Sequence, residues 1–241
     1  MYKRLIKDAS VYSISSVLAR GFSLITVPIY TRILNPADYG ALDLLSYFAV
    51  LAPLITGAAL DQAVGRFYLD SDDEAEKKRI ASTVLFYTVF ILCIFIPIAR
   101  PIAEYMANTW LSGQVTYQTV LLVFAFAWTQ SIFNIVCNQL KYLFLSKKFA
   151  ICNIGNIIVS TILSFSFVVI FDLGVFGVFL GQTLGQLVFV TLSLYYARES
   201  YAPVFHWHTL KRMLGYSLPL VPGTVAFLQN TIPSRAKKRV P

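Results

Sequence analysis

The residue with the clearest chemical potential is Arg20, a cation inside the long apolar stretch SSVLARGFSLITVPIYTRILNP at residues 15–36. A charge at the centre of a membrane helix costs about 2.5–3.5 kcal/mol on insertion scales, so this arginine needs a counter-charge. Asp43 or Asp61 could supply it within the chain. Otherwise the partner is an anionic ligand, and a guanidinium suits phosphate because its fork of N–H groups binds two oxygens at once.

Polar side chains recur at helical spacing in the other apolar stretches. Residues three or four positions apart share one face of a helix. The sets with this spacing are Ser13, Ser16, Arg20 and Ser23; Gln130, Asn134, Asn138 and Lys141; Asn153, Asn156, Ser160 and Ser164; and Gln182 with Gln186. Asp43 and Asp61 would also share a face, because about five helical turns separate them on one helix.

Lipid cannot hydrogen-bond these groups, so they must face one another or a water-filled cavity. For any single Asn or Ser, an interhelical hydrogen bond of about 0.6–2 kcal/mol is the simpler interpretation. For the whole set, with a buried arginine among them, we favour a cavity. The residues predicted to line it are Ser16, Arg20, Asp61, Arg66, Gln130, Asn134, Asn138, Asn153 and Asn156.

Other functional motifs are missing from the sequence. It has no P-loop, nucleophile elbow, HExxH or paired-carboxylate motif, so we predict that the chain is not an enzyme and needs no cofactor. Cys93, Cys137 and Cys152 lie in apolar stretches without a CxxC pair, which predicts small buried side chains and neither a disulfide nor a metal site. The segment His206-Trp207-His208 is typical of an interfacial connector with an aromatic anchor.

Composition defines the class of protein. Of 241 residues, 57% are hydrophobic and 13% charged, whereas a soluble domain has about 25% charged residues to cover its surface. Apolar stretches of about 20 residues match a bilayer core and exceed the short alternating strands of a membrane barrel. The net charge is +8, but the basic residues cluster between the apolar stretches and not on one soluble face. This placement argues against nucleic-acid binding. We therefore predict an all-α polytopic membrane protein.

Six spans are predicted, followed by the start of a seventh. They cover residues 11–34, 40–64, 81–103, 119–140, 150–171 and 175–197. Pro97 and Pro101 should kink or end the third. Gly174, Gly177, Gly181 and Gly185 form a small-residue face for packing on the sixth. The predicted organisation is a six-helix lobe at 1–197, a connector at 198–212, the start of helix seven at 213–230 and a basic tail at 231–241.

The distribution of Lys and Arg predicts the orientation. With a cytoplasmic N-terminus, the inner segments hold Lys3, Arg4, Lys7, Arg66, Lys77, Lys78, Arg79, Lys141, Lys147, Lys148, Arg198, Lys211 and Arg212, whereas the outer segments hold Arg32 and Arg100. We therefore expect a multi-pass protein of the inner (cytoplasmic) membrane with its N-terminus inside.

Three segments in order resemble a known family. TVPIYTRILNPADYGALDLL (residues 26–45), GAALDQAVGRFYLDSDDEAEKKR (57–79) and LKRMLGYSLPLVPGTVAF (210–227) resemble the first-to-second helix passage, the end of helix two and the start of helix seven of polysaccharide flippases. These flippases belong to the multidrug/oligosaccharidyl-lipid/polysaccharide exporter superfamily. The likeness extends to about residue 229 and covers the amino-terminal lobe.

The resemblance implies a substrate and several residue roles. Such flippases move an oligosaccharide on polyprenyl pyrophosphate from the inner to the outer leaflet through a cationic cavity between two lobes. Arg20 would meet the pyrophosphate, Arg66 would be structural or at the entrance, Arg32 structural, and Asp61 a counter-ion or coupling site. The implied partners are the lipid-linked oligosaccharide, membrane lipids and polysaccharide polymerase or assembly proteins.

One departure from the family keeps other functions open. Only the first lobe and the start of helix seven are recognisable, and TIPSRAKKRVP (residues 231–241) does not continue a membrane helix, which suggests a frameshift or premature stop. The alternatives are a non-transporting lobe or assembly subunit, and a multidrug-type antiporter of the same superfamily. A polyprenyl-phosphate glycosyltransferase is disfavoured because the outer loops are almost free of carboxylates.

Overall fold

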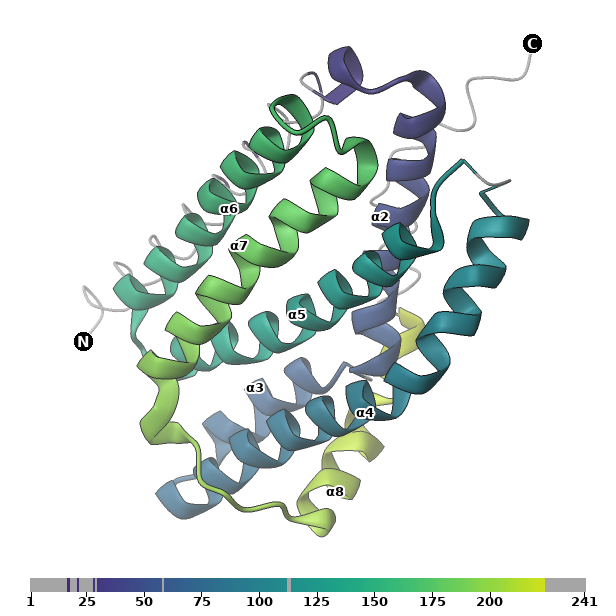
Figure 1. The fold of residues 1–241 in the computed structure, drawn as a ribbon. Coiled ribbons are helices and arrows are strands. Elements are labelled where there is room, and N and C mark those ends of the chain that lie inside the picture. Colours follow the sequence, from purple (N-terminus) through teal and green to yellow (C-terminus); the bar gives the residue numbers. More distant parts are fainter. Residues whose placement is uncertain are drawn as a thin grey trace.

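Helices follow the apolar stretches of the sequence. A computed structural model describes residues 17, 21, 28, 30–57, 59–111 and 114–223, and the regular structure of these residues is all helical (Figure 1). Within them, four helices are long and apolar enough to cross a membrane. These are α4 (Glu74–Thr109), α5 (Tyr117–Tyr142), α6 (Ser146–Val169) and α7 (Gly174–Ala197), which the short 3-10 helix η1 (Arg198–Ser200) continues. The prediction of an all-α polytopic membrane protein is confirmed.

The predicted second span, residues 40–64, is wrong as one continuous helix. The segment forms α2 (Pro36–Thr56) and α3 (Leu60–Asp70). Pro53 has no N–H group and weakens the last turns of α2. The Gly57 N–H closes that helix on the Pro53 carbonyl at 2.8 Å, and Ala59 then adopts a left-handed conformation with φ of 51°. Asp43 and Asp61 therefore lie on different helices and do not share the predicted face.

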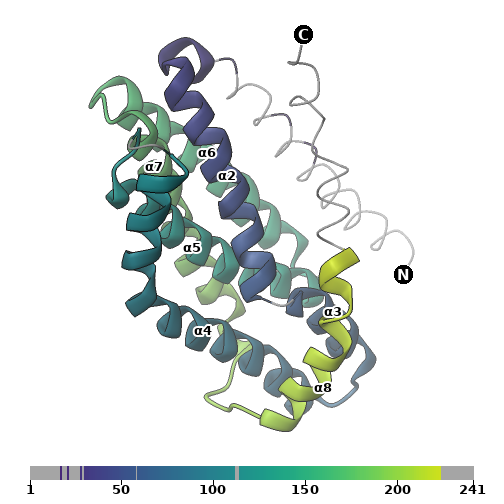
Figure 2. The same ribbon diagram turned by 90° about the vertical axis from the view of Figure 1, so that its right-hand side faces the viewer.

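The third predicted span, residues 81–103, is the middle of α4. Pro97 and Pro101 each remove one backbone hydrogen bond, yet they do not end the helix, which continues to Thr109. Figures 1 and 2 show α4 changing direction along its course, and proline is the usual cause of such a kink.

At the start of α4, the Asp73 carboxylate accepts a hydrogen bond from the Ala75 N–H at 3.0 Å, which satisfies one free donor of the first turn.

Helices α6 and α7 pack closely through glycine. A Cβ atom at Gly181 would collide with the backbone of Ser164 on α6, and one at Gly185 would collide with Ser160. A Cβ at Gly177 would lie 3.1 Å from the backbone of Phe167 on α6, a tight but less severe contact. This confirms the packing role predicted for these three glycines. Gly174 is the exception: it has open space around it and a φ of +52°, a conformation that glycine adopts without strain at the start of α7.

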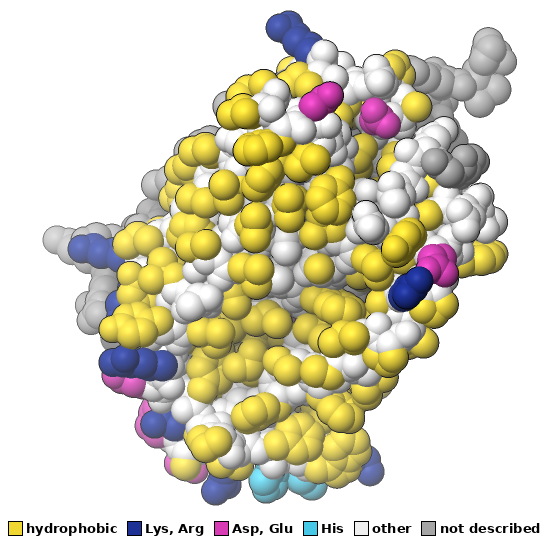
Figure 3. All heavy atoms as spheres, viewed as in Figure 1, with side chains coloured by type: hydrophobic (Ala, Val, Ile, Leu, Met, Phe, Trp, Pro, Cys, Tyr) yellow, Lys and Arg dark blue, Asp and Glu magenta, His cyan; other side chains and the backbone are white. Residues whose placement is uncertain are grey.

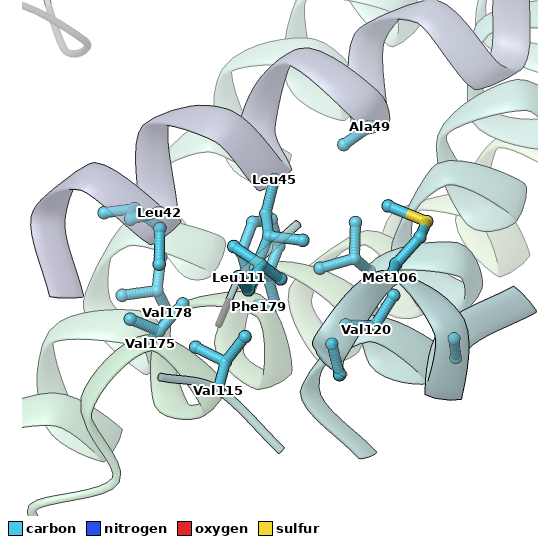
Figure 4. Close-up of a cluster of buried hydrophobic side chains, with 14 of the residues drawn as sticks. Leu42, Leu45, Ala49, Met106, Leu111, Val115, Val120, Val175, Val178 and Phe179 are labelled. Carbon is cyan, nitrogen blue, oxygen red and sulfur yellow. The ribbon is translucent and has the colours of Figure 1, made fainter. Parts of the chain in front are cut away.

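The largest hydrophobic cluster joins α2 to α4, α5 and α7. In Figure 4, Leu45 points from α2 toward Phe179 of α7 and Leu111, and the Leu45 side chain is 0% exposed. In a membrane such contacts stabilise the bundle by close packing, because the lipid tails are as apolar as the core. Helix α2 is held in place in this way.

The connector after η1 is attached to α4 by two buried hydroxyls. The Ala202 N–H donates to Ser82 Oγ at 2.8 Å, and the His206 N–H donates to Thr83 Oγ1 at 3.2 Å. Just before the first of these bonds, burial raises the pKa of Tyr201. The connector therefore follows a defined path across the start of α4.

Helix α8 (Trp207–Ser217) begins inside the predicted connector, so the connector is shorter than residues 198–212. Leu210 and Met213 are buried in a cluster shared with α3 and α4, whereas Trp207 is 66% exposed. The predicted start of helix seven, at residue 213, falls within α8. The basic tail at 231–241 lies outside the described residues.

Charged side chains gather at the ends of the bundle. Figure 3 shows a broad hydrophobic face with Lys, Arg, Asp and Glu mainly at its margins. The α3–α4 turn, the α5–α6 turn, the end of α7 and the start of α8 lie toward the lower end of Figure 1, so most of the predicted inner cations are at one end. The direction in which the chain crosses the membrane remains a prediction.

The three cysteines differ in burial. Cys137 and Cys152 are buried as predicted, whereas Cys93 is exposed.

Candidate functional site

The break between α2 and α3 opens a small pocket against α5. The pocket has a volume of about 150 Å³ and is lined by Val50, Pro53, Gly57, Ala59, Asp61, Ser131, Asn134 and Ile135. The pocket is therefore large enough to hold several water molecules. Two of the predicted cavity residues, Asp61 and Asn134, meet here although they come from different helices.

Asp61 is held at the pocket by the end of α5. The Tyr142 hydroxyl donates a hydrogen bond to the Asp61 backbone carbonyl at 3.2 Å, and the Lys141 ammonium interacts electrostatically with the Asp61 carboxylate. Lys141 also lies 4.6 Å from the centre of the Phe149 ring on α6. Burial disfavours the charged form of the Asp61 carboxylate, and the positive charge of Lys141 offsets part of this cost.

Asn134 begins a chain of hydrogen bonds that leads from the pocket into the interface between α5 and α7. Gln130 Nε2 donates to Asn134 Oδ1 at 3.1 Å, and Gln186 Nε2 donates to Gln130 Oε1 at 2.5 Å. Thr129 Oγ1 then donates to Gln186 Oε1 at 2.9 Å. Gln186 is 1% exposed. This network links α5 to α7 by interhelical hydrogen bonds, and Asn134 at one end of it lines the pocket.

A leucine at Gln186 should loosen the α5–α7 interface. The Gln186→Leu substitution removes both interhelical hydrogen bonds of this side chain, and we expect it to lower the free energy of unfolding by about 0.6–2 kcal/mol. Thermal unfolding of the purified protein in detergent measures this loss. Gln182→Leu is the control, because the bond to Ser160 Oγ at this position uses the Gln182 backbone carbonyl. An equal loss in both variants would contradict the role of the Gln186 side chain.

The polar residues of α6 make hydrogen bonds within this helix and to α7. Ser160 Oγ donates to Asn156 Oδ1 at 3.1 Å, and Ser164 Oγ donates to the Val178 carbonyl of α7 at 2.8 Å. Asn153 and Asn138 are half-buried. None of these residues lines the pocket at Asp61. Of the predicted set, Asp61 and Asn134 line the pocket, whereas Gln130 and Asn156 make side-chain hydrogen bonds elsewhere.

Arg66 lies at the interface between α3 and α8. Its guanidinium is 4.6 Å from the centre of the Tyr216 ring, and it approaches Asp70 at 3.8 Å. The Arg212 guanidinium of α8 lies in turn 4.7 Å from the Phe67 ring of α3. Each helix therefore places an arginine over an aromatic ring of the other. Arg66 does not line the pocket at Asp61, and its functional role stays a prediction.

Removing either half of the Arg66–Tyr216 contact should weaken the attachment of α8. We expect Arg66→Gln and Tyr216→Leu each to lower the free energy of unfolding by about 0.5–1 kcal/mol, with less than additive loss in the double variant. A double-mutant cycle from thermal unfolding measures this coupling. Strict additivity would show that the two side chains do not stabilise each other.

Two predicted site residues, Ser16 and Arg20, lie outside the described residues. Among the residues that the structure does describe, no group of three or more His, Cys, Asp or Glu is placed to hold a metal ion. Sequence reasoning missed Pro53 and Gly57, which shape the pocket. Part of the signal was present, because a proline inside a helical pattern kinks or ends the helix and an isolated glycine can cap its C-terminus.

One comparison with known proteins identifies a family for this chain. A family model described as "Polysaccharide biosynthesis protein" matches residues 5–232. A comparison with curated proteins and another with solved structures each find no match. The family model covers nearly the whole chain, including all the helices described above. The chain therefore belongs to the polysaccharide biosynthesis protein family, the family of polysaccharide flippases and exporters.

Proposed function

We propose that this chain acts in moving an oligosaccharide, carried on polyprenyl pyrophosphate, across the cytoplasmic membrane for the synthesis of a surface polysaccharide. The observation that carries the proposal is the family match over residues 5–232. The long apolar helices α4 to α7 support a task within the membrane. The proposal includes an inner-membrane location with the N-terminus in the cytoplasm, and polymerase or assembly proteins as partners.

The pocket at the α2–α3 break suits the sugar portion of such a substrate. Asp61 offers carboxylate oxygens, and Asn134 offers an amide group that both donates and accepts. Sugar hydroxyls pair well with this combination, because each hydroxyl also donates and accepts. The apolar atoms of Val50, Pro53 and Ile135 can pack against the C–H groups of a sugar ring.

Arg20 is proposed to bind the pyrophosphate. A guanidinium makes strong bidentate hydrogen bonds to phosphate oxygens, and this contact would offset the cost of a cation in an apolar stretch. In this arrangement the anionic and the sugar parts of the substrate are recognised by different residues. Substitutions at Arg20 and at Asn134 should therefore have separable effects.

A reconstituted assay tests the proposal. The purified 241-residue chain is placed in liposomes with a fluorescent polyprenyl-pyrophosphate oligosaccharide in both leaflets, and chemical quenching from outside reports exchange between leaflets. We expect exchange well above that of protein-free liposomes. Asn134→Leu should slow it by about tenfold, as expected for the loss of one or two hydrogen bonds of about 1 kcal/mol each, and Asn108→Leu, at an exposed position of α4, is the control.

The outcomes separate the competing functions. Binding of the oligosaccharide lipid without exchange would assign the chain to a non-transporting lobe or assembly subunit. Exchange of a cationic drug but not of the lipid would assign it to a multidrug-type antiporter. If the chain neither binds the oligosaccharide lipid nor exchanges it between leaflets, the proposal is overturned.

A further inference from the structure

A second cavity lies at the end of the bundle where α5, α6 and α7 meet. Its volume is about 400 Å³, and its polar lining comes from Lys148 at the start of α6 and from Arg198, Glu199 and Ser200 after α7. It is separate from the pocket at Asp61, with which it shares no lining residue. Three predicted spans begin or end at this cavity, so a bilayer crossed by these helices would place it at the level where lipid headgroups meet water.

The two cations of this cavity are held by aromatic rings. Lys148 Nζ lies 5.0 Å from the centre of the Tyr196 ring, and the Arg198 guanidinium carbon lies 4.7 Å from that of Tyr195. The salt bridges found among the described residues involve neither cation. Glu199 lines the same cavity and opposes an anion, but two cations outweigh it. Cation–π contacts orient the two charges and leave them available to a ligand.

An apolar surface leads along α7 to this cavity. Leu184, Val188 and Tyr195 are 40%, 58% and 59% exposed, and their spacing of four and seven residues puts them on one face of the helix. Tyr195 also lines the cavity. A ligand with a phosphate in the cavity and hydrocarbon chains on this face would satisfy both surfaces together.

We propose that the cavity between Lys148 and Arg198 binds the phosphate of an anionic glycerophospholipid, whose acyl chains lie along the exposed face of α7. A free phosphate ion would use the cations but not the apolar face. Basic pockets between membrane helices attract anionic headgroups, and the positive end of α6 adds to this attraction. This inference does not depend on the proposed transport function, because the cavity is distinct from the transport pocket.

Lipid titration of the purified chain tests the proposal. The protein is held in phosphatidylcholine nanodiscs or mild detergent, dioleoyl phosphatidylglycerol is added, and native mass spectrometry counts the bound lipid. We expect phosphatidylglycerol to bind more tightly than phosphatidylcholine. Lys148→Gln and Arg198→Gln should each weaken binding by about fivefold, the effect expected for one cation near a lipid surface, and the double variant by more than tenfold.

Matched variants separate this cavity from general surface charge. Lys78→Gln with Arg79→Gln removes the same charge from an exposed part of α4 and should leave binding within about twofold of the original. Glu199→Gln removes the opposing carboxylate and should tighten binding by about threefold. This gain cannot arise from misfolding, so the proposal stays testable even if a cation variant is unstable.

Four results would overturn the proposal. The first is equal affinity for phosphatidylglycerol and phosphatidylcholine. The second is an equal loss in the α4 control variant. Displacement of phosphatidylglycerol by inorganic phosphate at equal concentration would assign the cavity to free phosphate, and displacement by polyprenyl phosphate would assign it to the transported lipid. If the original chain binds phosphatidylglycerol as expected but shows no lipid exchange in the liposome assay, the proposed transport function fails and the lipid-binding proposal stands.

Discussion

Gly181→Leu is expected to prevent stable association of α6 with α7. A Cβ atom at Gly181 would collide with the backbone of Ser164, and a backbone cannot move aside as a flexible side chain can. Overpacking of this kind costs about 1–3 kcal/mol and sometimes more, and the α6–α7 contact is the most extensive between helices of this structure. We expect a large loss of monodisperse protein in size-exclusion chromatography and a clearly lower melting temperature.

Gly215→Leu is the matched control for this prediction. Gly215 lies on α8 and has open space where a Cβ would be built. Leucine is also the better helix former, so the control should keep or slightly raise the melting temperature. A normal melting temperature for Gly181→Leu would show that α6 and α7 are farther apart in the membrane than in this structure.

Arg20→Ala is expected to abolish tight binding of the substrate anion. If the guanidinium binds pyrophosphate, its loss leaves the phosphate charge unpaired in an apolar setting, and affinity for a polyprenyl pyrophosphate should fall by about a hundredfold. Arg20→Lys keeps the charge but loses the bidentate geometry, so an intermediate affinity is expected. Titration of the purified variants with the lipid measures both effects.

The competing explanation for Arg20 is an ion pair within the chain. In that case Arg20→Ala would lower the amount of folded protein, because a buried carboxylate would lose its partner. Asp61→Asn or Asp43→Asn would then restore it. Unchanged substrate affinity together with unchanged abundance would remove Arg20 from both roles.

The positions of the helices in the second half of the chain were predicted correctly from the sequence. The predicted spans at 119–140, 150–171 and 175–197 agree with α5, α6 and α7 to within a few residues at each end. Apolar length is a strong signal, because a segment that crosses lipid must satisfy every backbone group by helical hydrogen bonds. The same reasoning failed at residues 40–64, where Pro53 and Ala59 end one helix and start another without lowering the hydrophobicity of the stretch.

Spacing along a helix predicted which polar residues share a face, but it did not predict which partner each of them contacts. Helical periodicity correctly placed Gln130 and Asn134 on one face of α5, where they share a hydrogen bond. It could not show that Gln130 continues to Gln186 whereas Asn134 opens onto a pocket with Asp61. Such pairings depend on which helices are neighbours, and spacing within one helix carries no information about its neighbour.

The sequence by itself determined that this chain is helical and belongs in a membrane, and its motifs correctly indicated the family. These properties follow from composition, apolar length and local residue order. Only the tertiary structure decided that Asp61 meets Asn134, that Arg66 packs on Tyr216, and that Lys148 and Arg198 share a cavity. The physical reason is that each pair joins segments far apart in the chain, and helix packing brings them together.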